Sequence, residues 1–323
     1  TALLVQEDSV FARSIVAALK NSAYFDLVAQ ARSPAELDDL VRRGEVQFAI
    51  TVPGDFTRRL VRGERAQVLV EADAADPSAT GPAVAALAAL PSQALAHDLK
   101  GALAPAIGKA PFEVVVHRRY NPEAITAYNI VPGLLGIILS MTLVMMTALS
   151  VTREAERGTM ESLLATPVEP IEVMAGKLAP YVAVGLVQTA IILLLARFLF
   201  DVPMVGGWLG LSLGVALFIV GSLALGFLMS TVARTQLQAM QMSMFYILPS
   251  ILLSGFMFPF RGMLAWAQAI GEIVPVTHFL RVVRGALLKG QGTSDMWREL
   301  AALLAFACVV TALAMARYRR TLD

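Results

Sequence analysis

The sequence predicts an α-helical integral membrane domain and, ahead of it, a small mixed α/β domain. Hydrophobic residues make up 57% of the 323 residues and charged residues only 16%, whereas ordinary soluble domains carry about 25% charge. The mean hydropathy is +0.66. Hydropathy also divides the chain, because residues 1–125 alternate short β-rich and helical runs while residues 126–323 contain long apolar segments. We therefore expect two domains with these bounds.

The first domain is predicted to contain at least four strands. Its β-rich runs are 2–5, 25–29, 47–52, 67–70 and 112–116. Helical runs lie between them, and one helix start is well marked. Ser33 supplies the N-cap, Pro34 the first-turn proline and Glu36 the acid of a capping box. The Ala-rich stretch 83–106 is also predicted to be helical.

The second domain contains five segments that are long enough to cross a hydrocarbon core, which takes about 20 apolar residues in a helix. They lie at about 130–151, 178–200, 208–230, 238–258 and 297–316. The stretch 259–296 between the last two is too polar to span yet rich in apolar residues. We expect one or two interfacial or re-entrant helices there, with protein or a water-filled cavity receiving their backbone polar groups.

A charged loop, 152–177, separates the first two spans. Its apolar residues recur at helical spacing between a Gly-Thr pair and a proline, which predicts a short amphipathic helix on the membrane surface. The residues that set this pattern are Gly158, Thr159, Met160, Leu163, Leu164 and Pro167. A partner protein could bind the apolar stripe of such a helix in a groove. The other interpretation is an ordinary interfacial helix that only turns the chain.

Positive residues predict the orientation. If the spans alternate, seven Lys and Arg residues of loop 152–177, the loop after the third span and the C-terminal tail share one side, against four in 259–296. The positive-inside rule assigns the richer side to the cytoplasm. Residues 1–125 are then extracytoplasmic. A chain beginning at Thr1 shows no export signal, so we expect a sixth span ahead of it.

Several function classes are disfavoured. The net charge of +1 argues against a nucleic-acid partner. The single cysteine, Cys308, permits no disulfide framework. The two Gly-Lys pairs are followed by Ala110 and Leu178 rather than Ser or Thr, so the chain has no P-loop and is not predicted to be an enzyme. The histidines do not sit at metal-ligand spacing, and no span carries a central acid of the kind an ion-coupled carrier uses.

Polar residues within the spans are candidates for a transport path, because polar groups in lipid face the interior of a helix bundle. These candidates are Gln188, Gln241, Ser243, Tyr246 and Ser250. Hydrogen bonding between helices, worth about 1 kcal/mol or less for each group, is the alternative role.

Three sets of residues resemble one family. Around loop 152–177 they are Arg153, Glu154, Glu156, Arg157, Gly158, Thr159, Glu161, Leu163, Leu164, Thr166, Pro167, Gly176, Lys177, Pro180 and Tyr181. Before the last span they are Pro275, Thr277, His278, Phe279, Arg281, Arg284 and Gly285. Ahead of the first span they are Tyr120, Asn121, Pro122, Glu123, Val131, Pro132 and Gly133. Together they resemble ABC type 2 exporter permeases, in the subgroup with a large extracytoplasmic domain between spans one and two.

The resemblance implies a six-span permease subunit of the bacterial inner membrane that moves a substrate outward by alternating access. It implies separate ABC ATPase subunits that hold ATP and Mg²⁺, a second permease subunit in a homodimer or heterodimer, and a periplasmic adaptor as a further partner. The implied ATPase-coupling residues are Arg157, Gly158, Thr159, Glu161, Leu163, Leu164, Thr166 and Pro167. The implied outer gate consists of Pro275, His278, Arg281 and Arg284 in the outer re-entrant segment 259–296.

A second hypothesis is a non-transporting membrane scaffold or mechanotransmitter that relays ATPase motion to extracytoplasmic partners. A polar, water-accessible cavity at the centre of the dimer would favour transport. A continuous apolar seal there would favour the relay.

Overall fold

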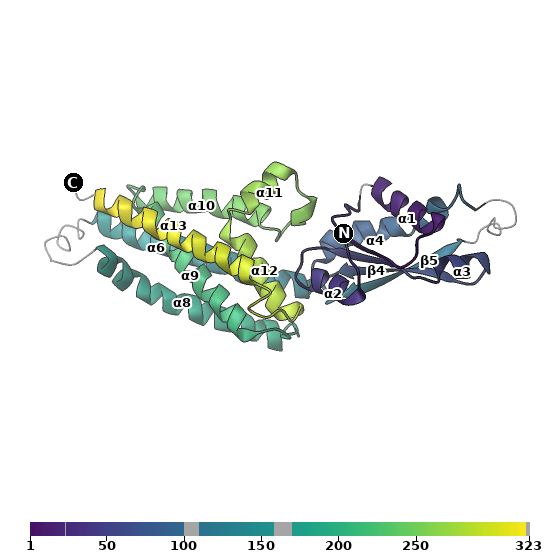
Figure 1. Cartoon of the computed structure of the whole chain (residues 1–323). Coiled ribbons are helices and arrows are strands. Elements are labelled where there is room, and N and C mark those ends of the chain that lie inside the picture. The colour runs from purple at the N-terminus through teal and green to yellow at the C-terminus, as the bar shows by residue number, and fades with distance from the viewer. Residues whose placement is uncertain (23, 100–109, 158–169, 321–323) are drawn as a thin grey trace. The chain divides into compact units, whose positions relative to one another are not determined.

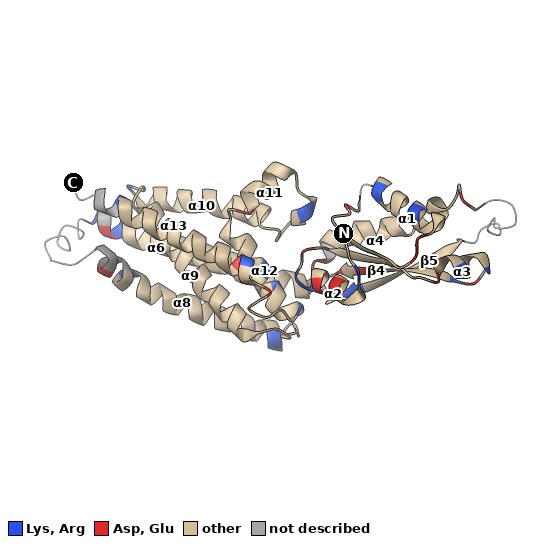
Figure 2. Cartoon of the chain, viewed as in Figure 1, with Lys and Arg blue, Asp and Glu red and all other residues tan. Residues whose placement is uncertain are grey.

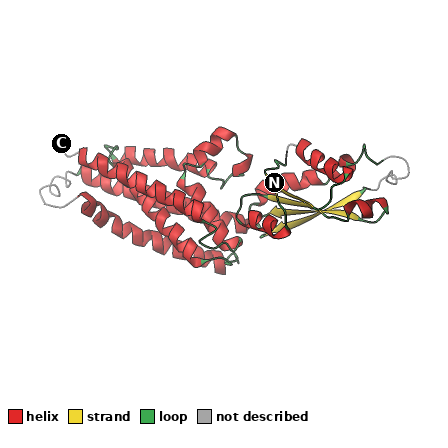
Figure 3. Cartoon of the chain, in the orientation of Figure 1, coloured by secondary structure: helices red, strands yellow, loops and turns green. Residues whose placement is uncertain are grey.

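The computed structural model describes residues 1–22, 24–99, 110–157 and 170–320. It divides into two compact units, Thr1–Ile125 and Thr126–Asp323 (Figure 1). In the described residues, every strand lies in the first unit and the second unit is helical (Figure 3).

The first unit is built on one five-stranded sheet with the order β2-β1-β3-β4-β5. The strands are β1 Ala2–Val5, β2 Ala29–Gln30, β3 Phe48–Val52, β4 Ala66–Asp73 and β5 Phe112–Arg119. β3 and β4 are antiparallel, and the other neighbours are parallel. The predicted strand 25–29 is wrong in its bounds, because β2 begins only at Ala29. Phe25 serves the core instead, with its ring edge-on to Phe48 at 5.2 Å.

Among the described residues of this unit, five helices cover the sheet: α1 Val10–Asn21, α2 Pro34–Arg42, α3 Phe56–Val61, α4 Pro77–Leu87 and α5 Leu90–Ala94. α2 packs in a small core of its own, whereas the other four belong to the larger core. The predicted start of α2 is confirmed, since Ser33 Oγ accepts a hydrogen bond from the Glu36 N–H at 3.2 Å. The stretch predicted to be helical, 83–106, contains the end of α4 and all of α5, and residues 100–106 lie outside the described residues.

The second unit contains α6 Thr126–Glu156, α8 Pro170–Phe198, α9 Trp208–Ser230, α10 Gln236–Leu253, η2 Phe260–Gly262, α11 Ala265–Gly271, α12 Pro275–Leu288 and α13 Trp297–Arg320. By length and composition, four described helices could cross a membrane: Thr126–Glu154, Ala175–Phe198, Trp208–Ser230 and Trp297–Arg317. Figure 2 shows charged residues gathered near the ends of these helices. Four of the five predicted spans therefore have a matching helix.

The predicted span 238–258 corresponds to α10, which ends at Leu253 and is not among those four helices. Its first two turns carry three glutamines, Gln236, Gln238 and Gln241, which lower its apolarity. The stretch 259–296 forms a 3₁₀ turn and the two helices α11 and α12, as the prediction of one or two non-spanning helices requires.

α9 is the central helix of this unit and α8 the peripheral one. Of the most apolar window of each helix, 61% is buried in α9 and 17% in α8. α9 packs against α6, α12 and α13, and Phe218 of α9 stacks on Phe279 of α12 with ring centroids 4.2 Å apart. Gly226 permits a close approach of α9 to α6, because a Cβ there would lie 2.5 Å from the Val144 carbonyl oxygen of α6.

Candidate functional site

α12 is enclosed by protein. Every residue from Pro275 to Leu288 is buried except Arg281 and Arg284, which are partly buried. Pro275 occupies the first turn, where its missing N–H costs nothing. Thr277 Oγ1 ties this turn to α11 by donating to the Gly271 carbonyl at 2.7 Å. The three charged or titratable side chains of α12, His278, Arg281 and Arg284, therefore need partners on the surrounding helices.

Two of them share a pair of acids. His278 Nδ1 lies 2.5 Å from Glu299 Oε2, in the first turn of α13, and its Nε2 lies 2.8 Å from the Glu272 carbonyl at the end of α11. Arg281 contacts both oxygens of the Glu272 carboxylate, at 2.6 and 3.1 Å, and Glu299 Oε1 at 3.4 Å. We call these four residues the ion cluster. It joins α11, α12 and α13.

The ion cluster favours a charged His278. Both ring nitrogens face oxygen acceptors, and an imidazolium with an ionised Glu299 satisfies both contacts. Burial lowers the pKa of His278, but hydrogen bonds to Glu299 and to the Glu272 carbonyl, together with the Glu299 charge, outweigh it and hold the pKa above its ordinary value. Arg281 opposes this rise slightly. The four charges then sum to zero.

Further contacts join α12 to the chain that leads from α10. The guanidinium of Arg281 lies 4.7 Å from the ring centroid of Phe260 in η2, which is within cation–π range. Arg284 Nη2 donates to the Gly255 carbonyl at 3.3 Å. Gly255 has a φ of +82° and follows the end of α10, so Arg284 holds the turn that leaves α10.

The four predicted gate residues therefore do not form one cluster. His278 and Arg281 meet in the ion cluster, whereas Arg284 is directed to Gly255 and Pro275 is a buried first-turn residue. Sequence reasoning missed Glu272 and Glu299. The available signal was charge balance, since Glu272 lies within the stretch 259–296 and Glu299 lies near the start of the predicted span 297–316, so both acids are close in sequence to the basic residues of that stretch.

The predicted coupling residues lie mostly outside the described residues. This applies to Gly158, Thr159, Glu161, Leu163, Leu164, Thr166 and Pro167. Arg157 is described and exposed at the end of α6. Beside it, Glu156 accepts hydrogen bonds from the backbone N–H and side-chain amide of Gln236 at 2.7 and 2.5 Å, and Lys177 forms an ion pair with Glu154. These pairs join α6, α8 and α10 at one end of the unit.

Of the predicted pathway residues, Gln188 lines a groove between α6 and α8 with a volume of about 580 Å³. The other lining residues are Ile138, Ala183, Val184, Val187, Ile191 and Ile192. Gln188 Nε2 donates to Thr142 Oγ1 at 3.1 Å, and its Oε1 is buried with no hydrogen-bond partner in the described residues. This groove is apolar apart from one amide.

The other four pathway residues belong to α10. Ser243 Oγ donates to the Ala239 carbonyl at 2.9 Å and Ser250 Oγ to the Tyr246 carbonyl at 2.7 Å. Gln241 is exposed and Tyr246 partly buried. Since the two serine hydroxyls bond their own helix, they are less available to a passing molecule than the Gln188 amide.

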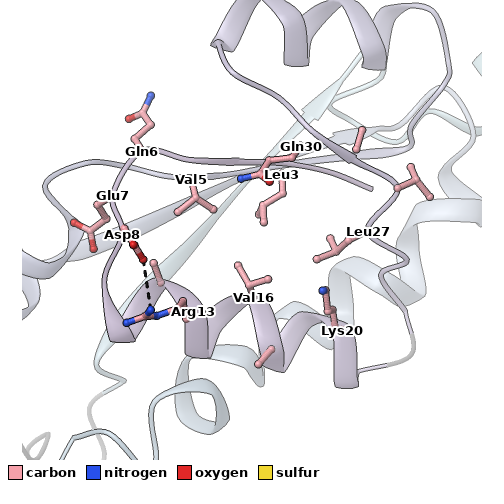
Figure 4. A pocket seen from close by; sticks show the side chains of 14 residues that line it. Leu3, Val5, Gln6, Glu7, Asp8, Arg13, Val16, Lys20, Leu27 and Gln30 are labelled. Carbon is pink, nitrogen blue, oxygen red and sulfur yellow. Dashed lines mark ion pairs between the residues drawn. The ribbon is translucent and has the colours of Figure 1, made fainter.

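The first unit contains a hollow of about 730 Å³ between α1 and the strands β1 and β2. Figure 4 shows Leu3, Val5, Val16 and Leu27 around its apolar part. At one end, Arg13 lies 3.8 Å from Asp8, and both side chains are largely exposed. The hollow is amphipathic and belongs to the first unit alone.

The family model described as ABC-2 family transporter protein matches residues 1–316. The chain belongs to the ABC-2 transporter family. It is 29% identical to the "Probable multidrug ABC transporter permease YbhS" of Escherichia coli, over 99% of this chain and 85% of that protein. It is 27% identical to the "Probable multidrug ABC transporter permease YbhR", over 92% and 79%, and 28% identical to the "Inner membrane transport permease YhhJ", over 89% and 76%, both of E. coli.

Membership of the ABC-2 family identifies the chain as a transport permease subunit and a multi-pass membrane protein, consistent with its four apolar helices. An ABC-2 permease works with ATPase subunits. The resemblance predicted from the sequence is thereby confirmed, and the relay hypothesis is not favoured.

Proposed function

We propose that this ABC-2 permease is the membrane subunit of an ATP-driven exporter in a bacterial inner membrane. It moves its substrate outward by alternating access, together with a second permease subunit. Separate ATPase subunits bind ATP and Mg²⁺ and dock on loop 152–177. The charge bias of the loops and the name of YhhJ, an inner membrane transport permease, support this location, with residues 1–125 extracytoplasmic and the C-terminus in the cytoplasm.

In this proposal α10 is a fifth membrane-crossing helix, shorter and more polar than the other four. Gln236, the first residue of α10, donates hydrogen bonds to Glu156 at the C-terminal end of α6. Residues 1–125 offer a surface to a periplasmic adaptor.

The observation that carries the proposal is the ion cluster on the buried helix α12. A largely buried helix whose cations are neutralised by acids on two neighbours has discrete positions, because moving it separates the largely buried pair of His278 and Glu299. Such an element suits a gate with a closed and an open state. α12 is therefore the proposed outer gate, with Glu272 and Glu299 as partners of the predicted gate residues.

The Gln188 groove is the proposed part of the substrate path. Its apolar walls suit the apolar part of an amphipathic molecule, and the Gln188 amide offers a single hydrogen-bonding position. A path of this composition agrees with the names of YbhS and YbhR, each a "Probable multidrug ABC transporter permease".

The test has two steps. An affinity-tagged chain purified from its native host should carry an ABC ATPase and a second permease chain, identified by mass spectrometry. The purified complex, reconstituted with its ATPase sites facing outward, should then accumulate ethidium or another lipophilic dye from a panel only when ATP is hydrolysed. A chain that purifies without an ATPase, or a complex whose hydrolysis moves none of the dyes and responds to none of them, would contradict the proposal.

A further inference from the structure

The connection between α8 and α9 binds the end of α12. The backbone N–H groups of Val205 and Gly206 donate to the carbonyls of Leu287 and Ala286 at 3.3 and 2.8 Å, and the Gly207 N–H donates to the Gln291 carbonyl at 3.2 Å. The last four carbonyls of any helix have no partner within the helix. The α8–α9 connection therefore caps α12 from a distant part of the chain.

Only glycine fits at position 206. A Cβ there would overlap the Ala286 carbonyl oxygen and lie 2.9 and 3.0 Å from the Ala286 Cα and carbonyl carbon. All three atoms are backbone, so no side-chain rotation relieves the contact. At Gly207 the nearest atom to an added Cβ is the Gln291 carbonyl oxygen at 3.6 Å, an ordinary contact. Of these two adjacent glycines, Gly207 can therefore accept a Cβ atom and Gly206 cannot.

α8 links this contact to loop 152–177. It begins at Pro170 and continues without interruption for 29 residues to Phe198, which corresponds to about 44 Å at about 1.5 Å per residue. Figure 1 shows α8 along one side of the second unit. Lys177 ties its first turns to Glu154 of α6, and its apolar window is the least buried of the four candidate spans.

Because α8 buries only 17% of its most apolar window within the chain, few contacts within the chain oppose a shift of α8 along its axis. α12 in turn is held at two places, by the ion cluster in its first half and by the α8–α9 connection at its last turn. A shift of α8 therefore pulls on one end of α12 while the ion cluster holds the other.

We propose that Gly206 is the positioning residue through which the α8–α9 connection holds the end of α12, so that a shift of α8 moves the proposed gate. This inference rests on the proposed function, in which ATPase subunits dock at the loop and α12 is the outer gate. It adds the physical connection between the two.

The experiment uses the full chain assembled with its ATPase and second permease. Spin labels are placed at Lys289, after the last turn of α12, and at Arg234, before α10, with Cys308 replaced by serine. The distance between the labels is measured without nucleotide and after trapping with ATP and vanadate. The variants are Gly206→Ala and the matched control Gly207→Ala. A third variant inserts two glycines between Pro203 and Met204, which lengthens the connection without a clash.

In the parent protein and in Gly207→Ala, trapping should shift the label distance. In Gly206→Ala and in the insertion variant the shift should vanish, and dye transport per ATP hydrolysed should fall about tenfold, within the usual range of allosteric coupling. Basal ATPase activity and assembly should change less than twofold.

The results separate the two proposals. If the parent shows no nucleotide-dependent shift, the outer gate assigned to α12 is wrong. If the parent shifts and an assembled Gly206→Ala or insertion variant shifts equally, the gate stands and the role of α8 and Gly206 is overturned. If Gly206→Ala does not assemble, the insertion variant decides the question alone.

Discussion

His278 Nδ1 lies 2.5 Å from Glu299 Oε2, across the contact between α12 and α13. This is the shortest contact of the ion cluster, and Glu299 also contacts Arg281. Glu299 is therefore the member of the ion cluster through which α13 neutralises both His278 and Arg281. Its replacement tests whether the cluster holds the two helices together.

Glu299→Gln should destabilise the protein by about 3 kcal/mol, because removing one partner of a largely buried ion pair leaves the opposite charge without compensation. Thermal unfolding in detergent, followed by tryptophan fluorescence, measures the effect as a lower Tm. Arg298→Gln is the control, since Arg298 is exposed beside the Trp297 ring and should leave Tm unchanged. Equal effects of the two variants would show that the ion cluster contributes no stability.

The contribution of His278 should depend on pH. Its pKa is raised in the folded protein, so the stability it adds is fully present below its ordinary pKa of about 6.5 and is lost as the pH rises through the higher folded value. The groups facing it are Glu272, Glu299 and Arg281. The Tm difference between the parent and His278→Gln should be largest near pH 6 and smaller near pH 9. His97→Gln, at an exposed position, should show no such trend.

Gly226→Ala should separate α9 from α6. An added Cβ lies 2.5 Å from the Val144 carbonyl oxygen and 2.9 Å from Thr147 Cβ, and overpacking of this kind costs about 1–3 kcal/mol. Gly176→Ala on α8 is the matched control, because an added Cβ there has no atom within 4 Å. Urea unfolding monitored by circular dichroism compares the two. A Gly226→Ala variant as stable as Gly176→Ala would contradict the close approach of these helices.

Two variants in the helix predicted for loop 152–177 test the proposed coupling role of this loop. Leu163→Pro costs about 3 kcal/mol of helix stability, enough to unfold so short a helix, and should abolish stimulation of the ATPase by transported dye. Glu161→Lys should do the same by reversing a charge. Membrane insertion, judged by the yield of folded protein, should not change. Normal stimulation in both variants would remove the coupling role from this segment.

Topology is tested by labelling in intact spheroplasts. With Cys308 replaced by serine, Ser92→Cys in the first unit should react with an impermeant maleimide added outside, whereas Arg157→Cys at the end of α6 should react only after lysis. Both positions are exposed. The opposite pattern would invert the proposed orientation.

The strands, the start of α2 and four long helices could be predicted because each depends on local periodicity or on capping residues adjacent in sequence. The bounds of β2 could not, since Phe25 packs on Phe48 and only the tertiary core decides between strand and loop there. The end of α10 shows a similar limit, because the predicted span continues to residue 258 whereas the helix ends at Leu253.

In the candidate site, the shared face of His278 and Arg281 on α12 could be predicted, whereas their acidic partners on other helices could not. The spacing of His278 and Arg281 along α12 predicts that they share a face, because residues three apart are neighbours on a helix. It does not predict Glu299, 21 positions after His278, since that pairing depends on how α13 packs against α12. The resemblance supplied the predicted gate residues, and only the structure supplied their acidic partners.

The pairing of α12 with Glu299 also constrains the order of events during synthesis. The last carbonyls of α12 are capped by the α8–α9 connection, which lies some 80 residues earlier in the chain. This capping segment has therefore already been synthesised when α12 leaves the ribosome. The charges of α12 are not balanced until α13 follows, because Glu299 belongs to the last helix. An Arg281 and a charged His278 without Glu299 are costly to place in an apolar bundle. Burial of α12 is thus completed only with the arrival of α13, and a chain truncated before residue 299 should remain open around α12 and be recognised as unfinished by membrane proteases.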